Sequence, residues 1–367
     1  MLVYKTKKFI FVMALTIIVL VLVLVLAFSL SIDNSFVTAQ TKDLPRSSSS
    51  NQGKVFVMYA ASLLKTFEDN FGPSFQKETG YTYEGEARGS VQVANMIIDG
   101  LRTPDVFVSA GTIPIMKLMN SSTGNNNGGG IGKSSSSTNL AEWLVKFASA
   151  EMVIAYSPTS HFYSDLEKAR IGEIPWYEVV SKQGFKFGRT DPELDPKGYY
   201  MIITAKLSNI YYNDSTIKQR ILGNDDRNPK QIFPEEILKS ILEQDQLDAV
   251  AAYKHEAVAR GLPYITLPPQ INLADPTFSD FYKRAFYTLD SGQIVFGEPI
   301  YFSVTIPETV KNLSGAISFV NFLLSTKGER ILKSQGLNYI KPVIEGKTDK
   351  VPSSIRNVTE PIKQLVS

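Results

Sequence analysis

The sequence predicts an α/β protein with two lobes, and three observations lead to this fold class. Near residues 54, 82 and 105 the chain shows in succession the pattern of a β-strand, a short turn and an amphipathic helix. Such a succession is typical of a parallel sheet flanked by helices. A second set of similar units follows between residues 157 and 290. Finally, the chain of 367 residues is longer than one hydrophobic core usually supports, which favours two lobes.

The chain begins with a segment suited to crossing a membrane. Three lysines precede residues 9–32, which contain no charged side chain. As a helix this run spans roughly 36 Å, against about 30 Å for the hydrocarbon core of a bilayer. The lysines before it and Asp33 after it place the amino terminus in the cytoplasm and the rest outside. We expect residues 1–32 to be either a retained signal anchor, which holds the protein on the extracellular face of the membrane, or a signal peptide, whose cleavage near residues 37–39 releases it.

The composition excludes several kinds of site and partner. The chain has no cysteine, so disulfides, thiolate metal sites and a lipid-modified cysteine are excluded. The formal charge is +2, and the lysines before the apolar run leave the remainder close to neutral, which argues against nucleic acid as a partner. The chain has no Gly-x-x-x-x-Gly-Lys-Ser/Thr phosphate loop, so it does not hydrolyse ATP itself. We expect a monomer without a bound cofactor.

Three segments lack the apolar periodicity of folded elements. Residues 33–53 contain a run of serines and are predicted to form a flexible linker. Residues 120–139 consist largely of Ser, Asn and Gly, which predicts a disordered surface insertion. Residues 346–367 are predicted to form a C-terminal tail.

The remaining elements follow from the two periodicities of secondary structure. Apolar runs that end at small residues predict strands, and apolar side chains three or four residues apart, such as Phe67 and Phe71, predict helices. The expected strands are residues 54–59, 82–86, 105–109, 152–156, 185–188, 249–253 and 300–306, and the expected helices, besides those of the first three units, are residues 142–147, 234–243, 316–324 and one that begins at Asp195.

Three of the predicted turns between a strand and a helix carry polar side chains: Ser62, Ser90 and Asp195. In a parallel sheet such turns lie at the carboxyl ends of the strands, where ligands bind in open α/β folds. Asp195 suits a helix N-cap and Pro196 the first helical position, and the free N–H groups of a helix start attract anions. Each residue alone is explained by ordinary capping. Together with Gly89, which allows close backbone approach, they would surround a small oxyanion.

The order of several motifs resembles the solute-binding proteins of ABC importers, in particular the archaeal tungstate/molybdate-binding branch. The motifs are Tyr59-Ala-Ala-Ser62, Gly89-Ser90-Val91, Asp191-Pro-Glu-Leu-Asp-Pro-Lys-Gly-Tyr199, Tyr211-Tyr-Asn-Asp-Ser-Thr-Ile217 and Phe319-Val-Asn-Phe-Leu-Leu-Ser-Thr-Lys-Gly328. The resemblance covers residues 55–342 apart from the insertion. No single motif is specific, whereas their order along the chain is.

The resemblance implies a type II periplasmic-binding-protein fold, in which two parallel-sheet lobes are joined by two crossing strands and preceded by an N-terminal transmembrane or signal helix. Lobe 1 would comprise residues 54–151 and 303–345, and lobe 2 residues 152–302. The crossing strands, expected at residues 152–156 and 301–305, would act as the hinge.

The resemblance also implies a function. A two-lobed clamp would capture a molybdate or tungstate oxyanion outside the cell, close around it and dock on a membrane permease, with energy from a separate ATPase. In such proteins, side chains at the positions of Ser62, Ser90 and Tyr253 donate O–H groups to the oxyanion. Carboxylates at the positions of Asp195 and Glu235 complete an octahedral shell around its metal.

Two positions in this set carry alternatives. Glu236 competes with Glu235, because the segment before them is shorter than the family leads us to expect. His255 stands where the family more often has a small residue, and we expect a partly exposed helical histidine. The carboxylates also decide the class of ligand. They would repel a dianion unless their oxygens bond to its metal centre, whereas a sulfate site would need donors only.

Other functions remain open on the sequence. A ferric-iron carrier of the same fold is suggested by two tyrosine pairs, Tyr199-Tyr200 and Tyr211-Tyr212, because phenolates suit Fe(III). Sulfate or phosphate would also fit this fold. A surface adhesion or structural protein is suggested by the apolar N-terminus, the insertion and the Asn-x-Ser/Thr motifs.

A hydrolase with a nucleophilic Ser62 or Ser90 would need a base, and His161 and His255 stand in no recognisable catalytic pattern. We therefore expect no enzyme. The sequence does not separate tungstate from molybdate.

Overall fold

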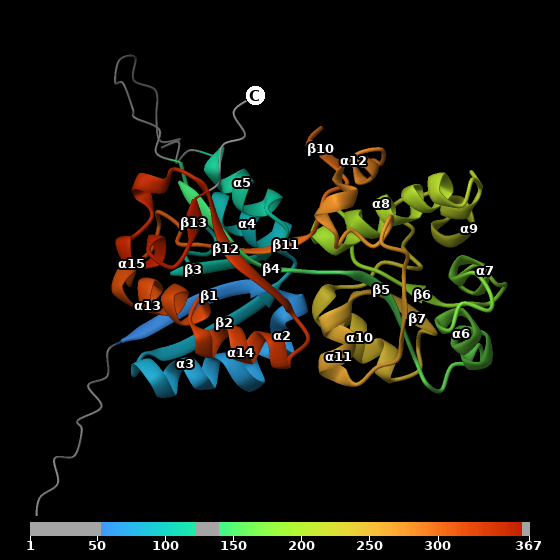
Figure 1. Ribbon diagram of the computed structural model, residues 1–367, viewed down its shortest axis with the longest axis horizontal. Helices are drawn as coiled ribbons and strands as arrows, with labels where there is room; N and C mark the ends of the chain where they lie inside the picture. Colours follow the sequence, from blue (N-terminus) through green and yellow to red (C-terminus); the bar gives the residue numbers. More distant parts are fainter. Residues whose placement is uncertain (1–52, 122–138, 362–367) are drawn as a thin grey trace, which may run out of the picture. The chain divides into compact units, whose positions relative to one another are not determined.

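The computed structural model describes residues 53–121 and 139–361 (Figure 1). The predicted helix at residues 1–32, nearly all of the linker and residues 122–138 of the insertion lie outside these ranges. Among the described residues, no helix is both long enough and apolar enough to span a membrane. The described residues form one compact unit.

The larger of two main sheets has seven strands in the order β13-β12-β4-β11-β3-β1-β2. These strands are β1 (Lys54–Ala60), β2 (Thr82–Arg88), β3 (Val106–Ala110), β4 (Trp143–Ser149), β11 (Tyr301–Thr305), β12 (Asn338–Gly346) and β13 (Glu360–Pro361). β1 runs parallel to β2 and β3, as the three successive strand-turn-helix units predict. β11, however, runs antiparallel to β3 and β4, and β12 runs antiparallel to β4.

The smaller sheet has the order β6-β7-β5-β8. Its strands are β5 (Met152–Tyr156), β6 (Phe187–Gly188), β7 (Ala249–Tyr253) and β8 (Tyr264–Thr266), and a separate hairpin consists of β9 (Phe286–Thr288) and β10 (Ile294–Phe296). β6 and β7 are parallel, but β5 is antiparallel to β7 and β8. The prediction of all-parallel lobes is therefore wrong, and both sheets are mixed. Two of the strands with antiparallel neighbours, β5 and β11, directly follow the passages of the chain between the sheets.

Strand β4 replaces a predicted helix. Residues 142–147 were expected to be helical, but Trp143–Ser149 form a strand between β11 and β12. All of its side chains except Lys146 are buried. An interior strand covered on both faces is apolar throughout, and a short apolar run of this kind cannot be distinguished from a buried helix by periodicity.

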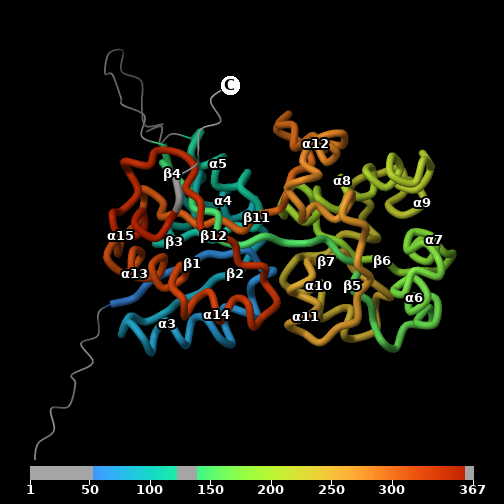
Figure 2. The backbone as a smooth tube through the Cα atoms, in the orientation of Figure 1, coloured from blue at the N-terminus to red at the C-terminus, as the bar shows by residue number. Residues whose placement is uncertain are grey.

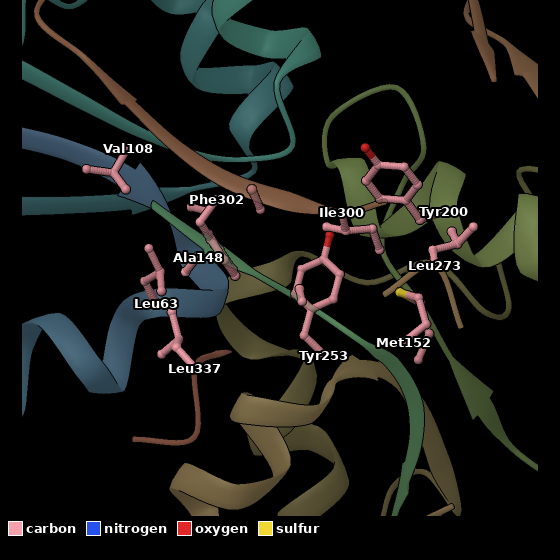
Figure 3. Close-up of a cluster of buried hydrophobic side chains, with 14 of the residues drawn as sticks. Leu63, Val108, Ala148, Met152, Tyr200, Tyr253, Leu273, Ile300, Phe302 and Leu337 are labelled. Atoms are coloured by element: carbon pink, nitrogen blue, oxygen red, sulfur yellow. The ribbon is translucent and has the colours of Figure 1, made fainter. Parts of the chain in front are cut away.

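The chain passes between the two sheets twice (Figures 1 and 2). The first passage is at Ala150–Glu151, between β4 and β5, and the second is at residues 297–300, between β10 and β11. Ala150 N donates a hydrogen bond to Ile300 O over 3.0 Å, so the two passages are joined to each other. Tyr253 and Phe302 are packed nearby, as Figure 3 shows. The role of these passages as a hinge, like the lobe boundaries, stays a prediction.

Helices cover both faces of the larger sheet. The helical elements are η1 (Ala61–Leu63), α2 (Leu64–Thr66), η2 (Phe67–Phe71), α3 (Gly72–Thr79), α4 (Ser90–Ile98), α5 (Ile113–Met119), α6 (Tyr163–Arg170), α7 (Trp176–Val180), α8 (Pro196–Tyr211), α9 (Ile217–Leu222), α10 (Glu235–Glu243), α11 (Lys254–Arg260), η3 (Pro276–Phe278), α12 (Ser279–Tyr282), α13 (Leu313–Leu323), α14 (Thr326–Ser334), η4 (Thr348–Lys350) and α15 (Ser353–Arg356). Alternate residues of β1 face two different apolar clusters, one beside α13 and the other beside α4 and α5. Within the predicted C-terminal tail, α15 packs on α13 and β13 pairs with β12.

Phe319 of α13 lies at the centre of an aromatic group beneath the larger sheet. Its ring centroid is 5.2 Å from that of Phe75, 5.3 Å from that of Phe71 and 6.2 Å from that of Phe67. Tyr83 stacks on it at 6.3 Å. Through this group α13 packs against the first two strand-turn-helix units.

We predict that Phe319→Ala lowers the free energy of unfolding by about 3–5 kcal/mol, because the surrounding rings cannot collapse into the space that the side chain leaves. Denaturant unfolding monitored by circular dichroism would measure the change. Leu313→Ala, on the same helix but 52% exposed, is the matched control and should cost less than about 1 kcal/mol. Equal effects of the two variants would contradict this account of the core.

Candidate functional site

The start of α8 is built as the sequence predicts. Asp195 is the N-cap and Pro196 the first helical residue. The Asp195 Oδ1 atom accepts hydrogen bonds from Lys197 N and from Thr190 Oγ1, both over 2.9 Å. The side chain is buried, and burial raises the pKa of Asp195 above its usual value. One carboxylate oxygen thus anchors the side chain, and the other is left for further contacts.

The start of α4 lies directly against the start of α8. Gln92 N donates to Leu194 O over 3.0 Å. A Cβ atom at Gly89 would lie 2.4 Å from Leu194 O and 3.2 Å from the Asp195 Cβ, so only glycine permits this approach. Ser90 is fully buried, and its Oγ accepts a hydrogen bond from Ala110 N. The Ser90 hydroxyl hydrogen therefore remains available for donation.

Glu235 is the first residue of α10, and only 4% of it is exposed. Its Oε1 accepts hydrogen bonds from Lys197 Nζ and Lys239 Nζ, each over 2.6 Å. Its Oε2 has no partner among the described residues. Glu236 differs, because its side chain is 24% exposed and lies 3.6 Å from Arg88. Of the two alternatives at this position, the structure places Glu235 inside.

Several hydroxyl groups in the same region are buried without a hydrogen bond of normal geometry in the described chain: those of Ser62, Tyr253 and Tyr199, the last of which has Tyr200 as a neighbour. Ser62 belongs to η1, which packs against α10. Tyr253 is the last residue of β7, and its ring centroid lies 5.3 Å from Lys197 Nζ. Buried polar groups are normally paired, because leaving one unpaired costs about 1–3 kcal/mol. Unpaired hydroxyls gathered beside two carboxylates indicate a place for a polar ligand.

A second glutamate completes a buried charge cluster that consists of Lys197, Lys239, Glu235 and Glu256. Glu256 accepts hydrogen bonds from Lys197 over 2.9 Å and from Tyr253 N over 2.7 Å, and lies 2.5 Å from Lys239. Although burial opposes it, the neighbouring glutamates raise the pKa of Lys197 well above its usual value, so this lysine is a cation. Burial would raise the pKa of Glu256, but the two lysines hold it below its usual range. Burial raises the pKa of Glu235 in spite of the same lysines.

A cleft of about 480 Å³ opens beside Asp195 and Glu235, whereas Ser62, Ser90, Tyr199 and Tyr253 do not line it. It lies where α4 faces the starts of α8 and α10, and it is lined by Arg88, Gly89, Gln92, Met96, Thr190, Asp191, Leu194, Asp195, Ile232, Phe233, Pro234, Glu235 and Glu236. Across residues 53–121 and 139–361, no three His, Asp or Glu side chains are grouped so as to hold a metal ion by themselves.

His255 is buried, and the expectation of a partly exposed histidine is wrong. Its Nε2 lies 3.2 Å from the carbonyl oxygen of Ser62, and its ring packs edge-on to that of Phe302 with centroids 5.2 Å apart. Burial lowers the pKa of His255 to about 4. The contact is with the Ser62 carbonyl, and His255 makes no hydrogen bond to the Ser62 hydroxyl.

Comparison with known proteins now adds to this geometry. Residues 55–338 match the family of bacterial extracellular solute-binding proteins. The chain belongs to this family. An uncharacterized solute-binding protein of Petrotoga mobilis is 30% identical over 311 residues, which are 83% of this chain and 89% of that protein. The molybdate/tungstate-binding protein WtpA of Pyrococcus abyssi is 30% identical over 337 residues, 85% of this chain and 90% of its own length. The resemblance inferred from the sequence motifs is confirmed.

Solved structures support the fold of this solute-binding protein. The periplasmic molybdate-binding protein of Azotobacter vinelandii aligns with a TM-score of 0.51 and 17% identity, over 78% of this chain and 98% of that one. The sulfate-binding protein SubI of Mycobacterium tuberculosis aligns with a TM-score of 0.50 and 12% identity, over 83% and 89%. At these identities the likeness shows the α/β periplasmic-binding-protein fold and not the ligand.

Sequence reasoning missed the charged residues that surround the two carboxylates. Lys197 stands inside the Asp-Pro-Lys-Gly-Tyr motif, in the first turn of α8. A lysine in the first turn of a helix is ordinarily exposed to solvent. Lys239 follows Glu235 by four residues, a spacing typical of a pair on a helix surface. The strongly apolar strand β7 just before Glu256 was the available signal that this glutamate is buried.

We predict that His255 makes this solute-binding protein less stable in mild acid. The pKa of His255 is depressed in the fold, so the unfolded chain binds the extra proton first and stability falls as pH falls from about 6.5 towards 4. Between pH 7 and pH 5 the contribution is about 2 kcal/mol. His255→Gln should remove this part of the pH dependence in chemical unfolding curves. His161→Gln, at an exposed histidine, is the control and should leave the dependence unchanged. If the free energy of unfolding of His255→Gln depends on pH in the same way as that of the unaltered protein, the prediction is contradicted.

Proposed function

We propose that this protein captures molybdate or tungstate for an ABC importer, with the oxyanion held at the buried junction of α4, α8 and α10. One observation carries the proposal: two buried carboxylates, Asp195 and Glu235, each have one oxygen anchored by hydrogen bonds and one oxygen without a hydrogen bond in the described chain, beside hydroxyl groups that also lack a partner there. The names of the relatives from Pyrococcus abyssi and Thermococcus kodakarensis, molybdate/tungstate-binding proteins, support the same ligand.

The charges of the site favour a metal-centred oxyanion. Molybdate and tungstate are dianions, and bare carboxylates would repel them in a site shielded from water. Lys197 and Lys239 offset this repulsion from within 2.6 Å of Glu235. Molybdenum and tungsten also accept additional hard oxygen ligands, whereas the sulfur of sulfate does not. The free carboxylate oxygens therefore favour molybdate and tungstate over sulfate or phosphate.

The remaining groups would bind the outer oxygens of the ligand. Ser62, Ser90 and Tyr253 are the O–H donors expected from the sequence, and the partnerless hydroxyl of Tyr199 adds a further donor. Hydrogen bonds to an ionised acceptor are roughly twice as strong as neutral ones. The N-terminal ends of α4 and α8 contribute backbone dipoles of the favourable sign.

The proposed place of action is the extracellular face of the membrane. The family is extracellular, which agrees with the orientation inferred from the N-terminal lysines. We extend the proposal to a monomer held by residues 1–32, or released by their cleavage, that delivers its oxyanion to a membrane permease driven by a separate ATPase.

Ferric iron is the second candidate, and one observation favours it. The phenol oxygens of Tyr199 and Tyr253 are buried and unpaired within the described chain, and phenolates bind Fe(III) well. Against it, burial raises the pKa of both tyrosines well above the usual value, which disfavours the phenolate. Tyr212 of the second tyrosine pair instead packs on Tyr177, with ring centroids 4.8 Å apart. Titration with ferric citrate would produce a visible charge-transfer band if iron were the ligand.

We predict that tungstate and molybdate raise the melting temperature of the full-length protein, since a ligand bound only by the native state stabilises it by mass action. At a hundredfold excess over Kd the gain is about 2.7 kcal/mol. Calorimetric titration and thermal scans with tungstate, molybdate, sulfate, phosphate and ferric citrate would measure this. A response to sulfate or phosphate equal to that of tungstate would contradict the role of the carboxylates.

We also predict that Asp195→Asn weakens tungstate binding at least about tenfold while stability without ligand changes by less than about 1 kcal/mol. Asn caps a helix as well as Asp does, so the structural role is retained and the charged ligand oxygen is lost. Asp275→Asn is the matched control, because Asp275 caps η3 in the same way, with Pro276 after it, on an exposed turn. Equal losses of stability and affinity in Asp195→Asn would show that Asp195 is only a cap.

A further inference from the structure

We propose that Lys197 is a positioning residue that fixes the two carboxylates relative to each other and so sets how the bound oxyanion is coordinated. The inference rests on the proposed function, because it concerns the same site. It assigns to Lys197 the selection between metal oxyanions and sulfate, through the positions of the two carboxylates.

Lys197 holds both carboxylates at once. Its backbone N–H donates to Asp195 Oδ1 over 2.9 Å, and its Nζ donates to Glu235 Oε1 over 2.6 Å. The two contacts engage one oxygen of each carboxylate. Since Lys197 is fully buried, its side chain has little freedom to exchange partners with water. The start of α8 and the start of α10 are thereby joined by a single residue.

Lys239 contacts the same oxygen, Oε1 of Glu235, but it does not connect α10 to α8. It lies four residues after Glu235 on α10, so it moves with that helix wherever the helix lies. Lys239 supplies positive charge. Lys197 supplies positive charge as well, but its side chain also connects the start of α8 to Glu235 on α10. This connection adds to the backbone hydrogen bonds of Arg189 with the segment before α10, from Arg189 N to Gln231 O over 2.8 Å and from Phe233 N to Arg189 O over 3.0 Å.

The same lysine also orients an O–H donor. Glu256 accepts hydrogen bonds from Lys197 Nζ and from Tyr253 N. The Lys197 ammonium lies 5.3 Å from the centroid of the Tyr253 ring, a favourable cation–π distance. Glu235 and Tyr253 are therefore positioned by the Lys197 side chain, and Asp195 by the backbone N–H of the same residue.

A fixed separation matters more for molybdate than for a plain anion. Both carboxylate oxygens must reach one metal atom, and groups that orient metal ligands typically contribute about 10–100-fold to affinity. If the separation is lost, the oxyanion keeps only its four own oxygens and is held by hydroxyl and amide donors alone. Sulfate can be bound in that manner too, so selectivity would fall with the coordination number.

The test compares two charge-balanced double variants of the full-length protein. K197M/E256Q removes the lysine that joins the helices, and K239M/E256Q removes the lysine that does not. Both lose one positive and one negative buried charge, and both retain one lysine on Glu235. Calorimetry would measure tungstate affinity, and the pre-edge of the molybdenum X-ray absorption spectrum would distinguish four-coordinate from six-coordinate bound molybdate.

We expect K197M/E256Q to bind tungstate at least about tenfold more weakly and to give a four-coordinate molybdate spectrum. K239M/E256Q also loses a lysine that offsets the repulsion between Glu235 and the dianion, so it should bind tungstate more weakly too, but it should keep the six-coordinate spectrum of the unaltered protein. If K197M/E256Q does not fold by circular dichroism, K197Q/E256Q provides the same comparison with a polar side chain in the same space.

Identical behaviour of the two double variants, whether both keep or both lose coordination, would overturn the inference and leave oxyanion capture in place. A four-coordinate spectrum in the unaltered protein would do the same. If the unaltered protein binds neither molybdate nor tungstate, the proposed function itself fails, and the role of Lys197 with it.

Discussion

The buried charge cluster of Lys197, Lys239, Glu235 and Glu256 is the constraint on which the rest of the site depends. Taking an ion out of water costs several kcal/mol even after relaxation, so buried charges persist only where each is paired and hydrogen-bonded. Each lysine here contacts both glutamates. The four residues come from α8, α10 and α11; Lys197, Glu235 and Glu256 lie in the first turn of their helices and Lys239 in the middle of α10. The cluster therefore brings the starts of α8 and α10 together and limits how they can move apart.

The cluster is better explained by how it orients the carboxylate oxygens of the site than by a contribution to the stability of the fold. Replacing buried ion pairs by apolar side chains of similar volume is often neutral or stabilising, so salt bridges as such do not account for this arrangement. What apolar packing cannot do is leave a chosen carboxylate oxygen free. In Glu235 the lysines occupy Oε1 and not Oε2, and in Asp195 the cap contacts occupy Oδ1. The charges neutralise one another, while the positive ends of the α8 and α10 dipoles remain to attract an anion.

How much of this the sequence could predict depends on the range of each interaction. The Asp-Pro cap at Asp195 and strands β5 and β7 were predictable because capping and short apolar runs are local properties. The antiparallel course of β11 and the strand β4 were not, because both depend on partners more than 100 residues away. Lys197 was missed for a related reason. In the sequence a buried lysine looks the same as an exposed one, and only its partners on α10 and α11 reveal that it is inside.

The site residues show the same division. The glycine at position 89 was predictable as a point of close approach, but its partner, the Leu194 carbonyl, was not. The choice between Glu235 and Glu236 could not be made from spacing, since adjacent residues of a helix point about 100° apart and the register of α10 depends on contacts with η1. Burial decides it, because the inward residue meets two lysines and the outward residue meets Arg88 at the cleft edge.

Closure and ligand chemistry are linked by the unpaired groups themselves. The hydroxyls of Ser62, Tyr199 and Tyr253 and the Oε2 of Glu235 are buried without partners in the described chain, and each such group costs about 1–3 kcal/mol. The oxygens of an oxyanion can accept hydrogen bonds from the three hydroxyls. The Glu235 oxygen is itself an acceptor without a proton to donate, so in such a ligand it can bond only to the metal centre. A sulfate ion would satisfy the hydroxyls but leave the Glu235 oxygen unpaired beside another negative charge. Under the proposed function, burial of these groups is favourable only around a ligand that satisfies both kinds of group, so selectivity would arise from the same free energy as the closure predicted for the two lobes.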